Sequence, residues 1–142
     1  MTPFDTALRV QRREVDAVKV SISVEVDRIN TLEAQSRAHE AREREERALA
    51  ASLPFASDAW AARMKREQLR INEAAYLAQA RLGQLRAQAV EAYGTMRAIE
   101  GAADRYQDEA DRTAATAEQT GIDDIAAARF LRARRMLKNR SA

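Results

Sequence analysis

The hydrophobic positions of the first fifty residues recur at the spacing of a coiled-coil helix. One position of the repeat reads Leu8, Val15, Ile22 and Ile29, and its companion reads Val18 and Leu32. A seven-residue repeat keeps one stripe facing a partner helix, so we predict a helix over about 3–52. After Leu32 the stripe fades into polar residues, and we expect the charged stretch 37–47 to be a solvated helix held by pairs such as Glu43–Arg47.

A cleaner repeat follows and predicts a second helix over about 58–138. One position reads Ala61, Gln68, Ala75, Leu82, Ala89, Met96, Ala103, Ala110 and Ala117, and its companion reads Met64, Ile71, Ala78, Leu85, Ala92, Ile99, Tyr106 and Thr113. Fifteen of these seventeen residues are apolar, and the many alanines let two helix backbones approach closely. No segment alternates with a period of two, so no strand is expected.

The two prolines lie where the helices should begin and turn. Thr2-Pro3-Phe4-Asp5 reads as a capping box, with Thr2 as N-cap and Asp5 in place of the usual glutamate. Pro54 removes a helical N–H and disfavours the α conformation of the preceding residue, which predicts a turn at about 53–57. Ser57 or Asp58 would then cap the second helix.

The predicted fold class is therefore all-α. Two long helices form an antiparallel coiled-coil hairpin, residues 1–142 make a single domain, and the second helix overhangs the first. The expected facing pairs are Leu8 with Tyr106, Val15 with Ile99, Val18 with Met96, Ile22 with Ala92, Ile29 with Leu85, and Leu32 with Leu82. With these pairs, the start of the first helix faces a position near residue 110 of the second helix. Beyond that position the second helix has no partner in the hairpin and is marginal by itself, so we expect it to contact another protein.

Composition and charge narrow the classes of function. The chain has no cysteine, and only 5% of its residues are aromatic, which predicts a thin apolar seam and no disulfide or thiolate chemistry. The net charge is +2, but residues 121–142 carry six cations and two acids, which leaves −2 for the rest. The start lacks the apolar run of a signal peptide, and a cytoplasmic location is expected.

Catalytic motifs are missing from the sequence. His39 is the single histidine, and without a second ligand at a typical spacing we interpret it as a surface or seam residue. Asp123 and Asp124 are adjacent on a helix and diverge, so they do not converge on a cation. No phosphate loop, GxSxG or HExxH motif is present. We expect no enzyme activity, cofactor, metal or small-molecule substrate.

Bulky residues gather around the predicted turn. They are Leu49, Leu53, Phe55, Trp60 and Met64. They either close the end of the hairpin or form a tip for docking a partner through Phe55, Trp60 and Met64, because exposed aromatic residues anchor interfaces.

The last twenty residues are both basic and amphipathic. Four interpretations stay open: docking on an acidic protein surface, nucleic-acid binding, membrane-surface binding, or a solvated and frayed end. The acidic body of the chain counts against nucleic acid, and the Asp123-Asp124 pair counts against a membrane surface.

The stretch from Tyr93 to Arg132 resembles the C-terminal pattern of the FliJ family, the small coiled-coil component of the flagellar type III export apparatus. The residues that carry the likeness are EAYGTMRAIE, then Glu118-Gln119, Asp123-Asp124, Ile125-Ala126 and Arg129. Gly121 departs from the pattern, because the family usually runs helical at this point. The question it raises is whether the helix continues through that residue.

The resemblance implies a stalk-like regulator of the hexameric flagellar export ATPase and an escort for export chaperones. Such proteins resemble the two-helix coiled coil of the F-type ATPase γ subunit and contact the export gate's large membrane protein. It also implies a cytoplasmic protein held peripherally at the inner membrane at the flagellar base. The residues expected to contact the ATPase are Arg9, Arg12, Arg13, Asp123, Asp124, Arg129 and Arg132. The alternative is a structural coiled coil that self-associates, and no nucleic-acid partner is expected.

Overall fold

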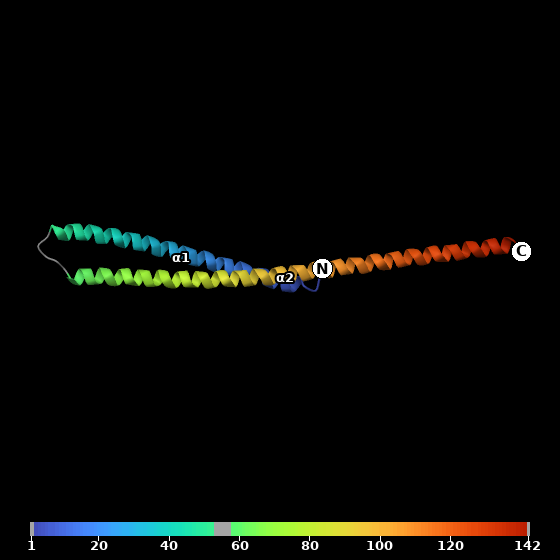
Figure 1. Ribbon diagram of the computed structural model, residues 1–142, viewed down its shortest axis with the longest axis horizontal. Helices are drawn as coiled ribbons and strands as arrows, with labels where there is room; N and C mark the ends of the chain where they lie inside the picture. Colours follow the sequence, from blue (N-terminus) through green and yellow to red (C-terminus); the bar gives the residue numbers. More distant parts are fainter. Residues whose placement is uncertain (1, 53–57, 142) are drawn as a thin grey trace. The chain divides into compact units, whose positions relative to one another are not determined.

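The computed structural model describes residues 2–52 and 58–141, and it is all-α over these ranges (Figure 1). Helix α1 spans Asp5–Ala51 and helix α2 spans Asp58–Arg140. The prediction of two long helices and no strands is confirmed for the described residues. The predicted turn, with Leu53, Phe55 and Ser57, lies outside them.

The chain divides into two compact units, which are described separately. Arg9–Met96 forms one unit, in which most of α1 lies alongside the first part of α2. Met1–Leu8 together with Arg97–Ala142 forms the other. The single-domain organisation suggested by the sequence stays a prediction.

The start of α1 is held by the expected capping box. The backbone N–H of Thr2 donates to Asp5 Oδ2 at 3.1 Å, and the Phe4 N–H donates to Thr2 Oγ1 at 3.3 Å. The Thr2 hydroxyl also donates to Asp5 Oδ1 at 2.9 Å. Backbone donors that have no partner within the helix are thereby satisfied, and the shorter aspartate serves where glutamate is usual.

The predicted seam of α2 is buried over much of its length. Every seam position from Met64 to Ala103 is buried or half-buried, whereas Ala61 and the positions from Tyr106 onward are exposed. In the unit Arg9–Met96 the core is thin. It is a cluster of Ile29, Ala78 and Leu82, with Ile22, Val26 and Leu32 packed against it.

Three of the six predicted facing pairs differ from the contacts that the structure shows. Gln11, not Ile22, reaches Ala92, because its Nε2 donates to the Ala92 carbonyl at 3.0 Å. Ile29 packs with Ala78 and Leu82 instead of Leu85. In the other unit, Phe4 and not Leu8 lies edge-on against Tyr106, with ring centroids 6.2 Å apart. Of the expected pairs, Leu32 with Leu82 is compatible with the packing.

The error has a geometric cause. The expected pairs are centred on residue 57, whereas the helix ends Ala51 and Asp58 are centred between residues 54 and 55. The midpoint between the two helix ends sets which residues of an antiparallel pair face each other. Because this midpoint lies closer to the N-terminus than we assumed, each residue of α1 faces a lower-numbered residue of α2 than we predicted.

The seam of α1 does not fade after Leu32, contrary to the solvated helix that we expected for residues 37–47. His39 is only 3% exposed, and Ser36, Glu43 and Glu46 are half-buried. The backbone places every third or fourth residue against α2 whatever its polarity, so the seam continues with polar side chains. The expected Glu43–Arg47 pair is confirmed, at 2.6 Å.

Helix α2 continues through Gly121 without a break. This glycine lies inside Asp58–Arg140, and no described glycine has a positive φ. In its own unit, Ala103 is the last buried position of α2, and residues 104–141 are all exposed.

Candidate functional site

The most distinctive surface is the C-terminal segment, which we define as residues 104–140 of α2. All of its residues are exposed, and at its beginning Tyr106 lies against Phe4. Its exposed large apolar side chains are Tyr106, Ile122, Ile125, Phe130, Leu131, Met136 and Leu137. A helix gains most of its stability from packing an apolar face against another element. Single exposed apolar residues are common on protein surfaces, whereas a cluster of them marks an interaction site.

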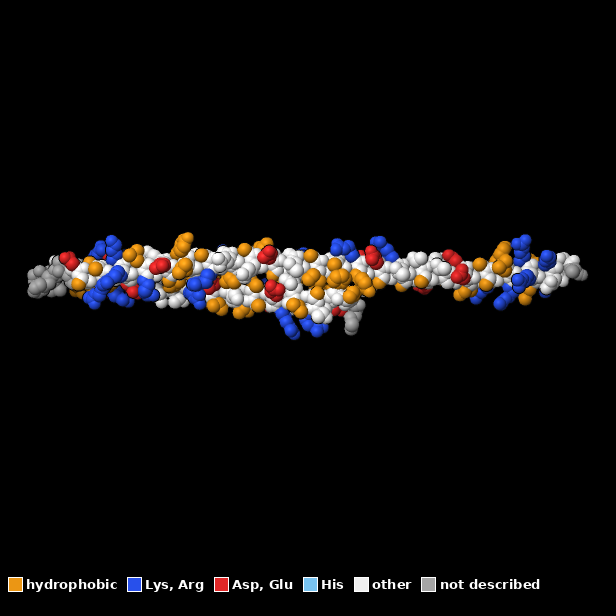
Figure 2. All heavy atoms as spheres, turned by 90° about the horizontal axis from the view of Figure 1, so that it is seen from below, with side chains coloured by type: hydrophobic (Ala, Val, Ile, Leu, Met, Phe, Trp, Pro, Cys, Tyr) orange, Lys and Arg blue, Asp and Glu red, His pale blue; other side chains and the backbone are white. Residues whose placement is uncertain are grey.

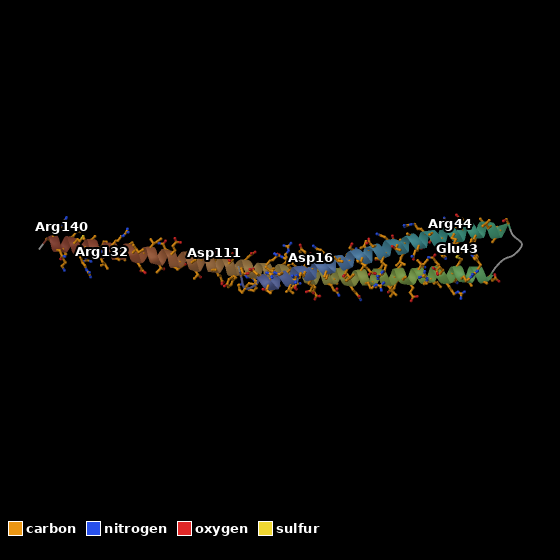
Figure 3. All side chains as sticks on the ribbon, turned by 180° about the vertical axis from the view of Figure 1, so that it is seen from behind. Asp16, Glu43, Arg44, Asp111, Arg132 and Arg140 are labelled. Carbon is orange, nitrogen blue, oxygen red and sulfur yellow. The ribbon has the colours of Figure 1, made fainter. Side chains whose placement is uncertain are left out.

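Charge is strongly polarised along this segment. Residues 104–124 carry seven acids and two arginines, whereas residues 125–140 carry six cations and no acid. Figure 2 shows the basic side chains gathered with apolar ones at the C-terminal end, and Figure 3 shows Arg132 and Arg140 beyond Asp111. Cations near a helix C-terminus also complement its dipole. The basic end is therefore suited to an anionic partner.

One face of the basic end is grooved. Ile122, Ile125, Ala126 and Arg129 line a shallow depression, as expected for residues three and four apart on a helix. Arg129 thus lies beside apolar side chains, and its aliphatic stem extends the apolar surface while its guanidinium reaches water.

The residues expected to contact an ATPase lie in both units, and all are exposed. Asp123, Asp124, Arg129 and Arg132 lie on the C-terminal segment, where Gln119 Nε2 donates to Asp123 Oδ1 at 3.0 Å. The other three, Arg9, Arg12 and Arg13, lie on α1 in the unit Arg9–Met96.

A second candidate site lies near the predicted turn. Trp60 and Met64 are half-buried and line an open groove of about 600 Å³. The rest of its lining is charged: Arg42, Arg63, Arg66, Arg70, Glu46 and Glu67. Phe55 lies outside the described residues. Leu49 is 63% exposed and does not close the hairpin end.

One ion pair organises this groove. Arg70 Nη2 donates to Glu67 Oε1 at 2.6 Å, and this hydrogen bond is the main reason that the pKa of Glu67 lies below its usual 4.5. The same bond raises the pKa of Arg70. Both residues face solvent, so the pair orders the groove but adds little stability.

The seam of the unit Arg9–Met96 holds buried polar groups, and the burial of Glu25 was not predicted. Glu25 is 5% exposed and contacts Arg28 at 3.2 Å and, across the helix pair, Arg81 at 3.1 Å. A signal was present, because Glu25 lies seven residues from both Val18 and Leu32 and so occupies the companion seam position.

His39 is the deepest of these polar groups. Neither ring nitrogen has a hydrogen-bond partner among the described residues, and neither does Gln68 Oε1. Of the two environments that we predicted for His39, the surface and the seam, the structure shows the seam. Over residues 2–52 and 58–141, no three His, Cys, Asp or Glu side chains gather as metal ligands would.

Comparison with protein-family models, with curated proteins and with solved structures gives no match. The likeness to the FliJ family therefore rests on the residues of the sequence. Within the described ranges, neither helix contains a stretch with the length and hydropathy needed to cross a bilayer.

Proposed function

We propose that this protein is a component of the bacterial flagellar type III export apparatus, a stalk-like regulator of the hexameric export ATPase and an escort for export chaperones. The observation that carries the proposal is the C-terminal segment: a helix whose residues are all exposed, on a helical hairpin, with the FliJ-like residues along it. A surface of this kind acts by contact and not by catalysis.

The chemistry of the segment fits an acidic ring lumen. Arg129 and Arg132 present charge at its basic end, and Phe130 is 67% exposed between them. Complementary charge speeds encounter and sets orientation, whereas buried apolar and aromatic anchors supply most of the affinity. Continuity of α2 through Gly121 supports the proposal, because a stalk needs an unbroken helix.

The groove near the turn is the proposed site for the other partners, the export gate membrane protein and the export chaperones. Trp60 and Met64 supply apolar surface there, and arginines border it. Aromatic residues bordered by charge are typical of interface anchors. The location that goes with these partners is cytoplasmic and peripheral to the inner membrane at the flagellar base.

The test uses the full chain and the export ATPase of the same genome. Adding the chain should raise ATPase activity and the fraction of hexamers. The double change Arg129→Glu and Arg132→Glu should remove most of this effect, whereas Arg37→Glu and Arg44→Glu, on exposed residues of α1, should leave it intact. An ATPase indifferent to the chain at micromolar concentration would refute the proposal.

A second candidate is a structural coiled coil that self-associates. The observation in its favour is that the alanine-rich seam continues beyond Ala103 at Tyr106, Ala110, Thr113 and Ala117, all of them exposed. Small residues allow helices to approach closely, so a second copy could cover this stripe. Sedimentation separates the candidates: the stalk should stay monomeric, and the scaffold should form oligomers as its concentration rises.

A further inference from the structure

The apolar face at the end of α2 is not a continuation of the hairpin seam. Extending the seam from Ala110 and Ala117 by sevens leads to Asp124, Leu131 and Lys138, which is largely a polar row. A helix paired along that seam, as α1 is, would therefore not bury the apolar residues of the last twenty positions.

Those apolar residues form a face of their own. Ile122, Ile125 or Ala126, Phe130, Ala133, and Met136 or Leu137 follow one another at steps of three and four, which is the spacing of one helix face. The depression lined by Ile122, Ile125, Ala126 and Arg129 confirms that its first members lie together. The large members of this face are between 53% and 69% exposed.

Cations occupy the opposite side of the same turns. Arg134, Arg135 and Lys138 are exposed, and none of the three forms an ion pair with a described residue. With Arg129, Arg132 and Arg140 they give six cations and no acid over residues 125–140. Asp123 and Asp124 precede this stretch, so they reduce its net positive charge only at its beginning.

An apolar face with a basic opposite side is the pattern of a helix that lies in the plane of a membrane surface. The apolar side chains enter the boundary of the acyl chains, and long arginine and lysine side chains reach back to the headgroups. Anionic headgroups attract each cation near the surface. A nucleic acid would satisfy the cations alone and leave the apolar face in water.

We propose that residues 122–140 of α2 bind the surface of an anionic lipid bilayer as an in-plane amphipathic helix. Phe130 and Leu137 are the apolar anchors, and Arg134, Arg135 and Lys138 contact lipid phosphates. The inference does not depend on the proposed export function. If both hold, lipid and the ATPase compete for this helix, because each covers the same side chains.

Vesicle flotation of the full chain tests the inference without the ATPase. The probes are vesicles of phosphatidylcholine alone and vesicles with about a third phosphatidylglycerol, the anionic lipid. The chain should float with the anionic vesicles at low salt, bind neutral vesicles far more weakly, and lose affinity toward physiological salt, because screening weakens the attraction of exposed charges.

Three variants locate the site. Changing Arg134, Arg135 and Lys138 together to Gln should lower partitioning on the order of 100-fold, from the attraction of three cations. A matched triple change of Lys19, Arg37 and Arg44 to Gln, all exposed on α1, should change it much less. Phe130→Gln with Leu137→Gln should abolish flotation, and circular dichroism should show that helix content is kept.

Several results would overturn the inference. One is a chain that does not float with anionic vesicles at low salt. Another is an α1 triple variant that loses as much binding as the variant of Arg134, Arg135 and Lys138. Flotation that survives Phe130→Gln with Leu137→Gln would contradict insertion of the apolar face. If the chain does not bind vesicles but still raises the activity of the ATPase, the apolar face binds a protein partner and the proposed export function stands.

Discussion

Replacing the buried histidine with leucine should make the protein more stable. His39 is 3% exposed, and neither of its ring nitrogens has a hydrogen-bond partner among the described residues. Leaving a buried polar group unsatisfied costs about 1–3 kcal/mol. The substitution His39→Leu removes that cost and places an aliphatic side chain at a seam position, where burial of apolar surface is favourable.

We expect the free energy of unfolding to rise by about 2 kcal/mol, the middle of the range for a buried unsatisfied group. For a chain of this size the melting temperature should rise by about 6 °C. Urea and thermal unfolding followed by circular dichroism measure both quantities. The substitution Arg37→Leu, on an exposed position two residues away, serves as the control and should change stability by less than about 0.5 kcal/mol.

The outcome that refutes this reasoning is a His39→Leu variant no more stable than the parent. It would mean that the imidazole is satisfied in solution and contributes to the native seam. The polar variant His39→Gln separates volume from polarity, because it keeps a buried polar group and should show none of the gain.

Three further changes probe other features. Arg81→Met should lower the free energy of unfolding by about 1 kcal/mol, because it removes the 3.1 Å contact to Glu25 across the helix pair. The loss is small because Arg81 is half exposed, and urea unfolding measures it. Arg70→Gln should raise the pKa of Glu67 toward its usual range, because it removes the hydrogen bond that lowers it most, as an NMR titration would show. In the parent, the depressed pKa means that the Glu67–Arg70 contribution is present above the usual pKa and is lost as the pH falls through the lowered one. Gly121→Ala should slow hydrogen exchange around residue 121, because an added Cβ meets nothing within 4 Å and alanine favours the helix by about 1 kcal/mol.

The helices and their capping could be predicted because they depend on local signals. The heptad repeat, the Thr2–Asp5 box and the prolines are each read over a few residues, and the helices observed, Asp5–Ala51 and Asp58–Arg140, lie close to the expected ranges. The apolar seam of α2 was likewise readable, because burial follows the repeat from Met64 to Ala103.

The facing pairs could not be predicted in the same way. They depend on where the two helices are joined and on many weak contacts across the seam. Because the seam is rich in alanine, these contacts do not strongly favour any one register. The burial of Glu25 was missed, and that of His39 was left open between surface and seam, for a related reason. A seam was inferred from hydrophobic residues, whereas the backbone determines burial by position, so polar residues on the same stripe are buried as well.

The candidate site could be located from the sequence but not assigned a partner. The basic and amphipathic end of the chain was visible in its residues, and the structure adds that residues 104–141 are all exposed. What the helix binds depends on the shape and charge of a second molecule, which neither a residue pattern nor a single chain contains.

Site-specific photo-cross-linking tests whether the C-terminal segment enters the proposed complex with the export ATPase. A photoreactive residue in place of Phe130, on the full chain, should give a covalent adduct with the ATPase. The same residue in place of Leu69, which is 57% exposed on α2 in the unit Arg9–Met96, should give little. Adduct formation at Leu69 alone, or at neither position, would contradict the account.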